Sequence, residues 1–142
     1  MHHNDIVITG MGVISAAGTG IAETLASFER GSRNAGPVTL FPTGLNYPVF
    51  EVKELPGVHD PGAQRTLTLA LVALDQALHD ARLVDLTGLR VGVCMGTTVA
   101  SQLNDLQFYA SYRGHGSAPM GPVDRFLKGN LAEYLALSLI HI

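Results

Sequence analysis

The fold is decided by two glycine-punctuated stretches, Ile6-Val7-Ile8-Thr9-Gly10-Met11-Gly12-Val13-Ile14-Ser15-Ala16-Ala17-Gly18 and Arg90-Val91-Gly92-Val93-Cys94-Met95-Gly96-Thr97-Thr98-Val99-Ala100-Ser101. Each opens with a run rich in β-branched residues, closes with small residues and leads toward a helical pattern. A continuous apolar run of this kind is typical of a strand that is buried on both faces. We therefore expect buried strands over residues 5–13 and 89–95.

A long helix is predicted between the two stretches, over residues 62–82, because apolar residues recur there at helical spacing. Its first half is apolar on more than one side, as in a helix that is sandwiched between layers. Gly31 and Asn130 are suited to stop one helix and to cap another. Shorter elements are expected at four further places: helices over 21–30, over 101–112 and from Leu131, and a strand over 48–53. This order of elements predicts an α/β fold of stacked layers with mainly parallel strands.

The composition is that of one ordinary folded domain. The 142 residues are 46% hydrophobic and 15% charged, which is apolar enough to bury a core. A net charge of −3 without a basic stripe argues against nucleic acid as a partner. The single cysteine, Cys94, excludes an internal disulfide and suits a reducing compartment, so we expect a cytoplasmic location. We find no signal-peptide pattern, and the longest apolar stretch is far shorter than the roughly 20 residues of a membrane span.

The glycines of the first stretch invite comparison with a dinucleotide-binding loop. That fingerprint requires G-x-G-x-x-G and an acidic residue about 20 positions further on. Here Ser15 occupies the position of the third glycine, and no acidic residue follows at the expected place. The alternative interpretation is structural: Gly10 and Gly12 let two layers approach closely, and Gly18 makes the turn. A nucleotide-binding α/β oxidoreductase domain remains as a rival.

Cysteine and histidine are the other side chains of this sequence that could carry chemistry. Cys94 lies in the middle of a predicted strand without a nearby base in the sequence, so we expect a buried and unreactive thiol. The six histidines show no metal-ligand spacing. His79 is expected on the polar face of the long helix, and His115 in a glycine-rich loop where a functional role stays open.

Taken together, these pieces resemble the N-terminal part of β-ketoacyl-acyl carrier protein synthases, which are condensing enzymes of the thiolase-like fold. The resemblance runs from about Ile6 to about Leu139 and rests on the order and spacing of its motifs. The motifs are the opening V-I-T-G-M-G-V-I-S-x-x-G, the helix that stops at Gly31, Asp60-Pro61, the helix over 70–83 that ends in D-A-R-L, R-V-G-V-C-M-G-T-T, and the helix opened by Asn130. Residues 102–129 depart from the family pattern.

The resemblance implies that residues 1–142 are a partial β-ketoacyl synthase domain. The fold would be the N-terminal half of a thiolase-like layered α/β fold, truncated before the catalytic strand. The complete enzyme would load an acyl group from acyl carrier protein onto a cysteine and condense it with a malonyl thioester. The nucleophile and the catalytic histidines would lie beyond this chain, so no catalytic residue is assigned. We expect no cofactor and no metal, no nucleic acid or membrane partner, and a homodimer when the protein is complete.

Thr98 and Val99 are the substrate-binding candidates. They follow a predicted strand and precede a helix, which is where α/β folds place ligands. The resemblance puts this turn beside the acyl-chain pocket and gives Val99 the position that limits chain length. Ordinary packing is the competing interpretation of Val99. A non-catalytic, chain-length-determining relative is a further rival for the whole protein, and the isolated chain is predicted to be inactive and poorly stable.

Overall fold

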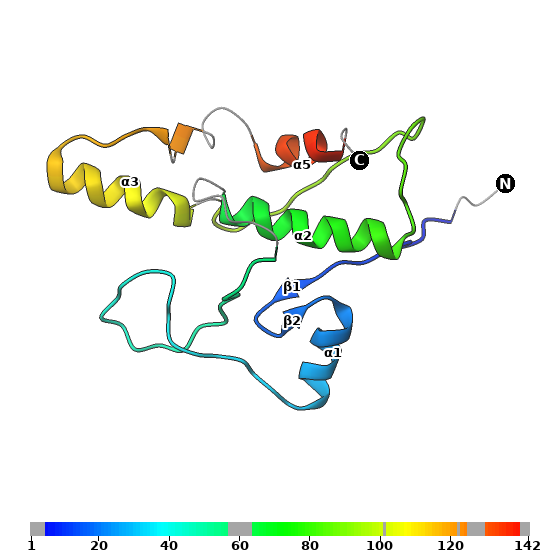
Figure 1. Cartoon of the computed structure of the whole chain (residues 1–142), viewed down its shortest axis with the longest axis horizontal. Helices are drawn as coiled ribbons and strands as arrows, with labels where there is room; N and C mark the ends of the chain where they lie inside the picture. The colour runs from blue at the N-terminus through cyan, green and yellow to red at the C-terminus, as the bar shows by residue number, and fades with distance from the viewer. Residues whose placement is uncertain (1–4, 57–63, 101, 122, 125–129, 140–142) are drawn as a thin grey trace. The chain divides into compact units, whose positions relative to one another are not determined.

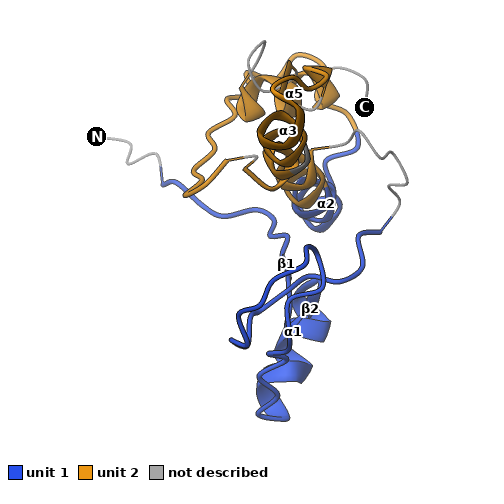
Figure 2. Cartoon of the chain, turned by 90° about the vertical axis from the view of Figure 1, so that its left-hand side faces the viewer, with its two compact units in different colours: residues 1–56, 72–84 blue, residues 57–71, 85–142 orange. Residues whose placement is uncertain are grey.

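The computed structural model describes residues 5–56, 64–100, 102–121, 123–124 and 130–139. These residues form a small mixed α/β chain (Figure 1). Its elements are β1 (Ile14–Ser15), β2 (Gly18–Thr19), α1 (Ile21–Glu29), α2 (Arg65–Asp80), α3 (Gln102–His115) and α5 (Leu131–Leu139). The chain divides into two compact units, unit 1 with residues 1–56 and 72–84, and unit 2 with residues 57–71 and 85–142 (Figure 2). Helix α2 gives its first turns to unit 2 and the remainder to unit 1.

Unit 1 contains the hairpin of the first stretch. Strands β1 and β2 pair antiparallel, with Ile14 opposite Thr19 and Ser15 opposite Gly18. The connection is the two-residue turn 16–17, where the Ala17 N–H donates to the Ser15 hydroxyl at 3.1 Å. Gly18 was expected to make this turn, but it is the first residue of β2. The sheet of the described residues is therefore an antiparallel hairpin, and the expected parallel pairing is not formed there.

The end of α1 confirms the predicted role of Gly31. This glycine has φ 64°, which is the left-handed conformation that glycine adopts without a Cβ penalty. Its N–H donates to the carbonyl of Phe28 at 2.9 Å, and the N–H of Ser32 donates to the carbonyl of Ser27 at 3.0 Å. This pair of bonds is the Schellman motif, which satisfies carbonyls that the helix leaves free.

Helix α2 ends in the same motif on a residue that is not glycine. Arg82 has φ 55°, and its N–H donates to the His79 carbonyl at 3.0 Å. The N–H of Leu83 closes the motif on the Leu78 carbonyl at 2.9 Å. A side chain with a Cβ is strained in this conformation, so Arg82 costs unit 1 stability that a glycine would not.

The two long strands expected from the sequence are not formed. Residues 5–13 and 89–95 are extended but lie outside the strands, and residues 48–53 contribute one isolated bridge, from Val49 to Gly36. Within the described part of the chain, residues 6–10 and 90–96 make no backbone hydrogen bond. A strand requires a neighbour that pairs with its N–H and C=O groups, and without one its apolar side chains stay in water. Ile6 is 100% exposed and Ile8 83% exposed, where full burial was predicted.

The helices α1, α2, α3 and α5 all lie close to the ranges that the sequence predicts. Helix α2 lies within the predicted range 62–82, although most of its apolar residues are half-buried rather than enclosed. The cap at Asn130 is confirmed, because its side-chain oxygen accepts the Glu133 N–H at 2.8 Å at the start of α5. Helix α3 runs further than the predicted end at residue 112 and includes His115, so the expected glycine-rich loop there is wrong. Ser101, the predicted cap of α3, lies outside the described residues. The sequence also predicts a helical turn or short helix over 122–128, of which residues 123–124 are helical and the others lie outside the described residues.

Candidate functional site

The turn that carries Thr98 and Val99 joins an extended segment to α3. The Thr97 hydroxyl accepts the N–H of Ala100 at 3.0 Å, and the N–H of Gln102 donates to the Val99 carbonyl at 3.2 Å. These bonds order the turn and force Ala100 into the left-handed region, with φ 47°. Thr98 and Val99 both point into solvent, and the Val99 side chain is 55% exposed. The two candidates therefore lie together on an open turn, available to a ligand or to further polypeptide.

This turn is fastened to the beginning of α2, within unit 2. The Thr66 hydroxyl donates to the carbonyl of Ala100 at 2.5 Å, and the Arg65 N–H donates to the side-chain oxygen of Asn104 at 3.2 Å. The starts of α2 and α3 consequently lie side by side. Sequence reasoning missed these contacts because each joins residues more than 30 positions apart.

Polar side chains are buried where these helices begin. Gln64 and Thr68 are each only 3% exposed, and the Thr68 N–H and hydroxyl both bond to the Gln64 carbonyl. Among the described residues, neither the side-chain amide of Gln64 nor one buried oxygen of Asp105 has a hydrogen-bond partner. Buried polar atoms without hydrogen-bond partners lower the free energy of unfolding, so the region where α2 and α3 begin destabilises unit 2.

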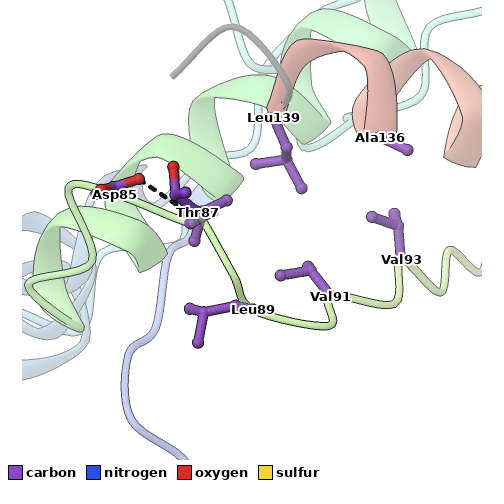
Figure 3. Close-up of a pocket in the computed structure, with 8 residues that line it drawn as sticks. Asp85, Thr87, Leu89, Val91, Val93, Ala136 and Leu139 are labelled. Carbon is purple, nitrogen blue, oxygen red and sulfur yellow. Dashed lines mark hydrogen bonds between the residues drawn. The ribbon is translucent and has the colours of Figure 1, made fainter.

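Unit 2 also holds a cavity of about 390 Å³. Figure 3 shows its walls: the extended segment after α2 lies on one side and α5 on the other. Its lining residues are Asp85, Leu86, Thr87, Leu89, Val91, Val93, Ala136 and Leu139. Thr98 and Val99 do not belong to this lining, so the structure does not bring the sequence candidates to the cavity.

A tight turn supplies the polar end of the cavity. The Thr87 N–H donates to the Asp85 carboxylate at 2.8 Å, and the Leu89 N–H closes the turn on the Leu86 carbonyl at 3.0 Å. Gly88 has φ 78°, as the third residue of a type II turn requires. The hydroxyl and the N–H of Thr87 hold the pKa of Asp85 below its ordinary value. The sequence signal was present in Asp-Leu-Thr-Gly, an acidic residue that can bond two residues on, followed by glycine.

The expected burial of Cys94 is wrong. Its side chain is exposed, because the segment that carries it has no strand partner in the described part of the chain. His79 is exposed on α2, as predicted, and His115 contacts the Ser111 carbonyl at 3.2 Å through Nδ1. The described residues contain no cluster of three or more His, Cys, Asp or Glu that would hold a metal ion. The other four histidines lie outside the described residues.

The glycines of the first stretch pack directly on α2. A Cβ placed on Gly10 would overlap the Ala77 carbonyl and lie 2.6 Å from the Ala81 nitrogen. A Cβ on Gly12 would overlap the Ala73 carbonyl oxygen in the same way. This confirms the structural interpretation of Gly10 and Gly12, because their missing side chains let backbone and helix touch. The side of Gly10 and Gly12 on which a Cβ would lie is thus occupied by the long helix.

Hydrogen bonds fix the same contact. The Met11 N–H donates to the Asp80 carboxylate at 2.9 Å, and the Val13 N–H donates to the Gln76 side-chain oxygen at 2.9 Å. Both acceptors lie on the face of α2 that meets the glycines. The first stretch and the end of the long helix are therefore one packed structure within unit 1.

A scan against known protein families, a search of curated proteins and a search of solved structures each found no match to this chain. Among the residues that the structure describes, no helix has both the length and the apolar character needed to cross a membrane.

Proposed function

We propose that this chain forms the N-terminal part of a β-ketoacyl-acyl carrier protein synthase, an acyltransferase of fatty acid or polyketide-type biosynthesis. The complete protein would act in the cytoplasm as a homodimer. It would accept an acyl group from acyl carrier protein and join it to a malonyl thioester with loss of carbon dioxide. Such chemistry uses a thiolate nucleophile, an oxyanion hole and histidines that stabilise the developing enolate. None of these groups is assigned to the present residues.

One observation carries the proposal: two motifs that give the resemblance are in contact. Gly10 and Gly12 of the opening V-I-T-G-M-G motif pack on the helix that ends in Asp80-Ala81-Arg82-Leu83. Met11 is bonded to Asp80 of that same D-A-R-L motif. The contact gives the glycines of the first motif and Asp80 of the second a shared structural role. The contact supports the interpretation of the two motifs as parts of one packed structure.

The unpaired apolar segments also support a place in a larger layered fold. Residues 6–10 and 90–96 are extended, carry apolar side chains and are without backbone partners in the described part of the chain. An apolar edge of this kind favours pairing with further strands. In the proposed thiolase-like fold, both segments would lie in a sheet completed by the rest of the synthase.

Thr98 and Val99 are the proposed substrate contacts in this account. They sit after one of the unpaired segments and before α3, on an ordered turn whose side chains are open. Once a sheet forms over residues 89–95, this turn would lie at the end of a strand, where α/β folds bind ligands. Val99 would then limit the depth to which the acyl chain enters.

Acyl loading tests the proposal. The protein encoded by the complete reading frame should be incubated with acyl carrier protein carrying a saturated acyl thioester and analysed by intact-mass spectrometry. A synthase gains the mass of one acyl group on a cysteine. A non-catalytic, chain-length-determining relative gains none. An oxidoreductase gains none either and is instead stabilised in a thermal shift by NAD(P), which the synthase is not.

A further inference from the structure

The cavity of unit 2 has two apolar walls of different origin. Leu89, Val91 and Val93 alternate along the extended segment, and this spacing places every second side chain on one face. Ala136 and Leu139 close the opposite wall at helical spacing on α5 (Figure 3). The result is an open cavity with apolar side chains on two sides and polar groups at one end, in which Leu89 and Val91 stay 55% and 51% exposed. Its volume of about 390 Å³ falls within the range of small-molecule sites, roughly 300–1,000 Å³.

One end of the cavity carries a carboxylate, that of Asp85. Asp85 and Thr87 line this end at the start of the extended segment, and the Asp85 carboxylate accepts the Thr87 N–H at 2.8 Å (Figure 3). The Asp85 carboxylate is exposed and is ionised at neutral pH, as aspartate ordinarily is. Among the described residues that line the cavity, none is Lys, Arg or His. Its electrostatic preference is therefore for a cation or a hydrogen-bond donor.

We propose that this cavity binds an aliphatic amine, with the alkyl chain between Val91 and Leu139 and the ammonium group on Asp85. This site is separate from the turn of Thr98 and Val99 and does not rest on the proposed synthase function. Each methylene group of the ligand that leaves water and is buried in the cavity strengthens binding about fourfold. The ion pair, on a fully exposed carboxylate, adds at most about fivefold, and only at low salt.

The same chemistry disfavours the obvious competitors. A fatty acid would bring its carboxylate beside that of Asp85. The two negative charges would repel each other, most strongly at low salt. A short polar amine would leave the apolar walls uncovered and gain only the exposed ion pair. The site should therefore prefer an ammonium head group to a carboxylate and a longer alkyl chain to a shorter one.

The test compares three probes of equal chain length on the isotope-labelled full chain: octylammonium, 1-octanol and octanoate, each below its micelle concentration. Amide chemical shifts of residues 85–93 report binding. We expect octylammonium to bind tightest and octanoate weakest, and decylammonium to exceed octylammonium. Asp85→Asn keeps an acceptor for the Thr87 N–H but removes the charge, so it should bring octylammonium down to the affinity of octanol.

A pair of variants on α5 tests the apolar walls and leaves the charge of Asp85 in place. Ala136→Leu fills the cavity from α5 and should weaken all probes, whereas Ala132→Leu on the same helix lies outside the lining and should not. Equal binding of octylammonium and octanoate, or unchanged binding in Ala136→Leu, would overturn the proposal. The proposal would also be overturned if no probe moved any amide chemical shift and the amides of residues 90–93 were protected from hydrogen exchange. In that case the cavity would be filled by polypeptide.

Discussion

Gly12 lies so close to Ala73 that a methyl group on the glycine would overlap the alanine carbonyl. The two residues belong to motifs far apart in the sequence, and their contact joins the extended N-terminal stretch to α2. Only a residue without a Cβ allows this approach, because the helix backbone itself is the neighbour and has no rotamer through which to yield.

Replacing Gly12 by alanine should therefore destabilise unit 1. Overpacking against a helix backbone costs about 1–3 kcal/mol, and chemical denaturation followed by circular dichroism measures it. Gly44→Ala is the matched control, since its added Cβ meets no atom within 4 Å. Equal midpoints for the two variants would show that the stretch does not pack on α2 in solution.

Arg82→Gly should have the opposite effect. The left-handed conformation at the end of α2 strains any residue with a Cβ, and glycine relieves this strain while adding freedom to the unfolded chain. The net expectation is a gain of about 0.5–1 kcal/mol in the free energy of unfolding. Arg30→Gly, at a right-handed helix cap, should give no gain. A loss of stability in Arg82→Gly would mean that α2 ends differently.

The turn around Asp85 makes part of the stability dependent on pH. Its pKa is lowered in the folded chain, so the unfolded chain holds the proton more readily. The contribution is present above the ordinary aspartate pKa and is lost as the pH falls through the folded value. Thr87→Val removes the hydroxyl and keeps the N–H, so a carboxyl titration by NMR should show the pKa of Asp85 moving part of the way back. Thr98→Val should leave that titration unchanged.

The helices of this chain were more predictable than its strands. The end of α1 at Gly31 and the cap of α5 at Asn130 depend on bonds between residues close in sequence, so local patterns suffice. Residues 5–13 and 89–95 carry a strand pattern, but a strand exists only with a partner, and no residue within the stretch supplies one. The exposure of Cys94 follows from the same missing partner.

The candidate site likewise has features that the local sequence predicts and features that it does not. Thr98 and Val99 were located from their place after an apolar run, and the structure adds the Thr97 bond that orders them. Their attachment to α2 through Thr66 has no local signal, because it depends on how two helices meet. The arginine at the left-handed end of α2 was equally hidden, since the pattern there favours glycine.

Val99→Phe tests the proposed role of the turn in the complete protein. An added ring cannot share a packed pocket with a long acyl chain, so the preferred primer should become shorter. Competition between acyl primers of several lengths, with products separated by mass, measures the preference. Thr98→Ser is a mild control that should leave the profile in place. A folded Val99→Phe variant with an unchanged profile would remove Val99 from the substrate site.

The central claim, that this chain belongs to a condensing enzyme, is tested most directly by the product of the complete protein. It should be supplied with an acyl-carrier thioester and malonyl-acyl carrier protein, and the carrier-bound products weighed by mass spectrometry. The account predicts a β-ketoacyl thioester longer than the primer by one acetate unit, formed with release of carbon dioxide. A folded complete protein that leaves both thioesters unchanged would contradict it.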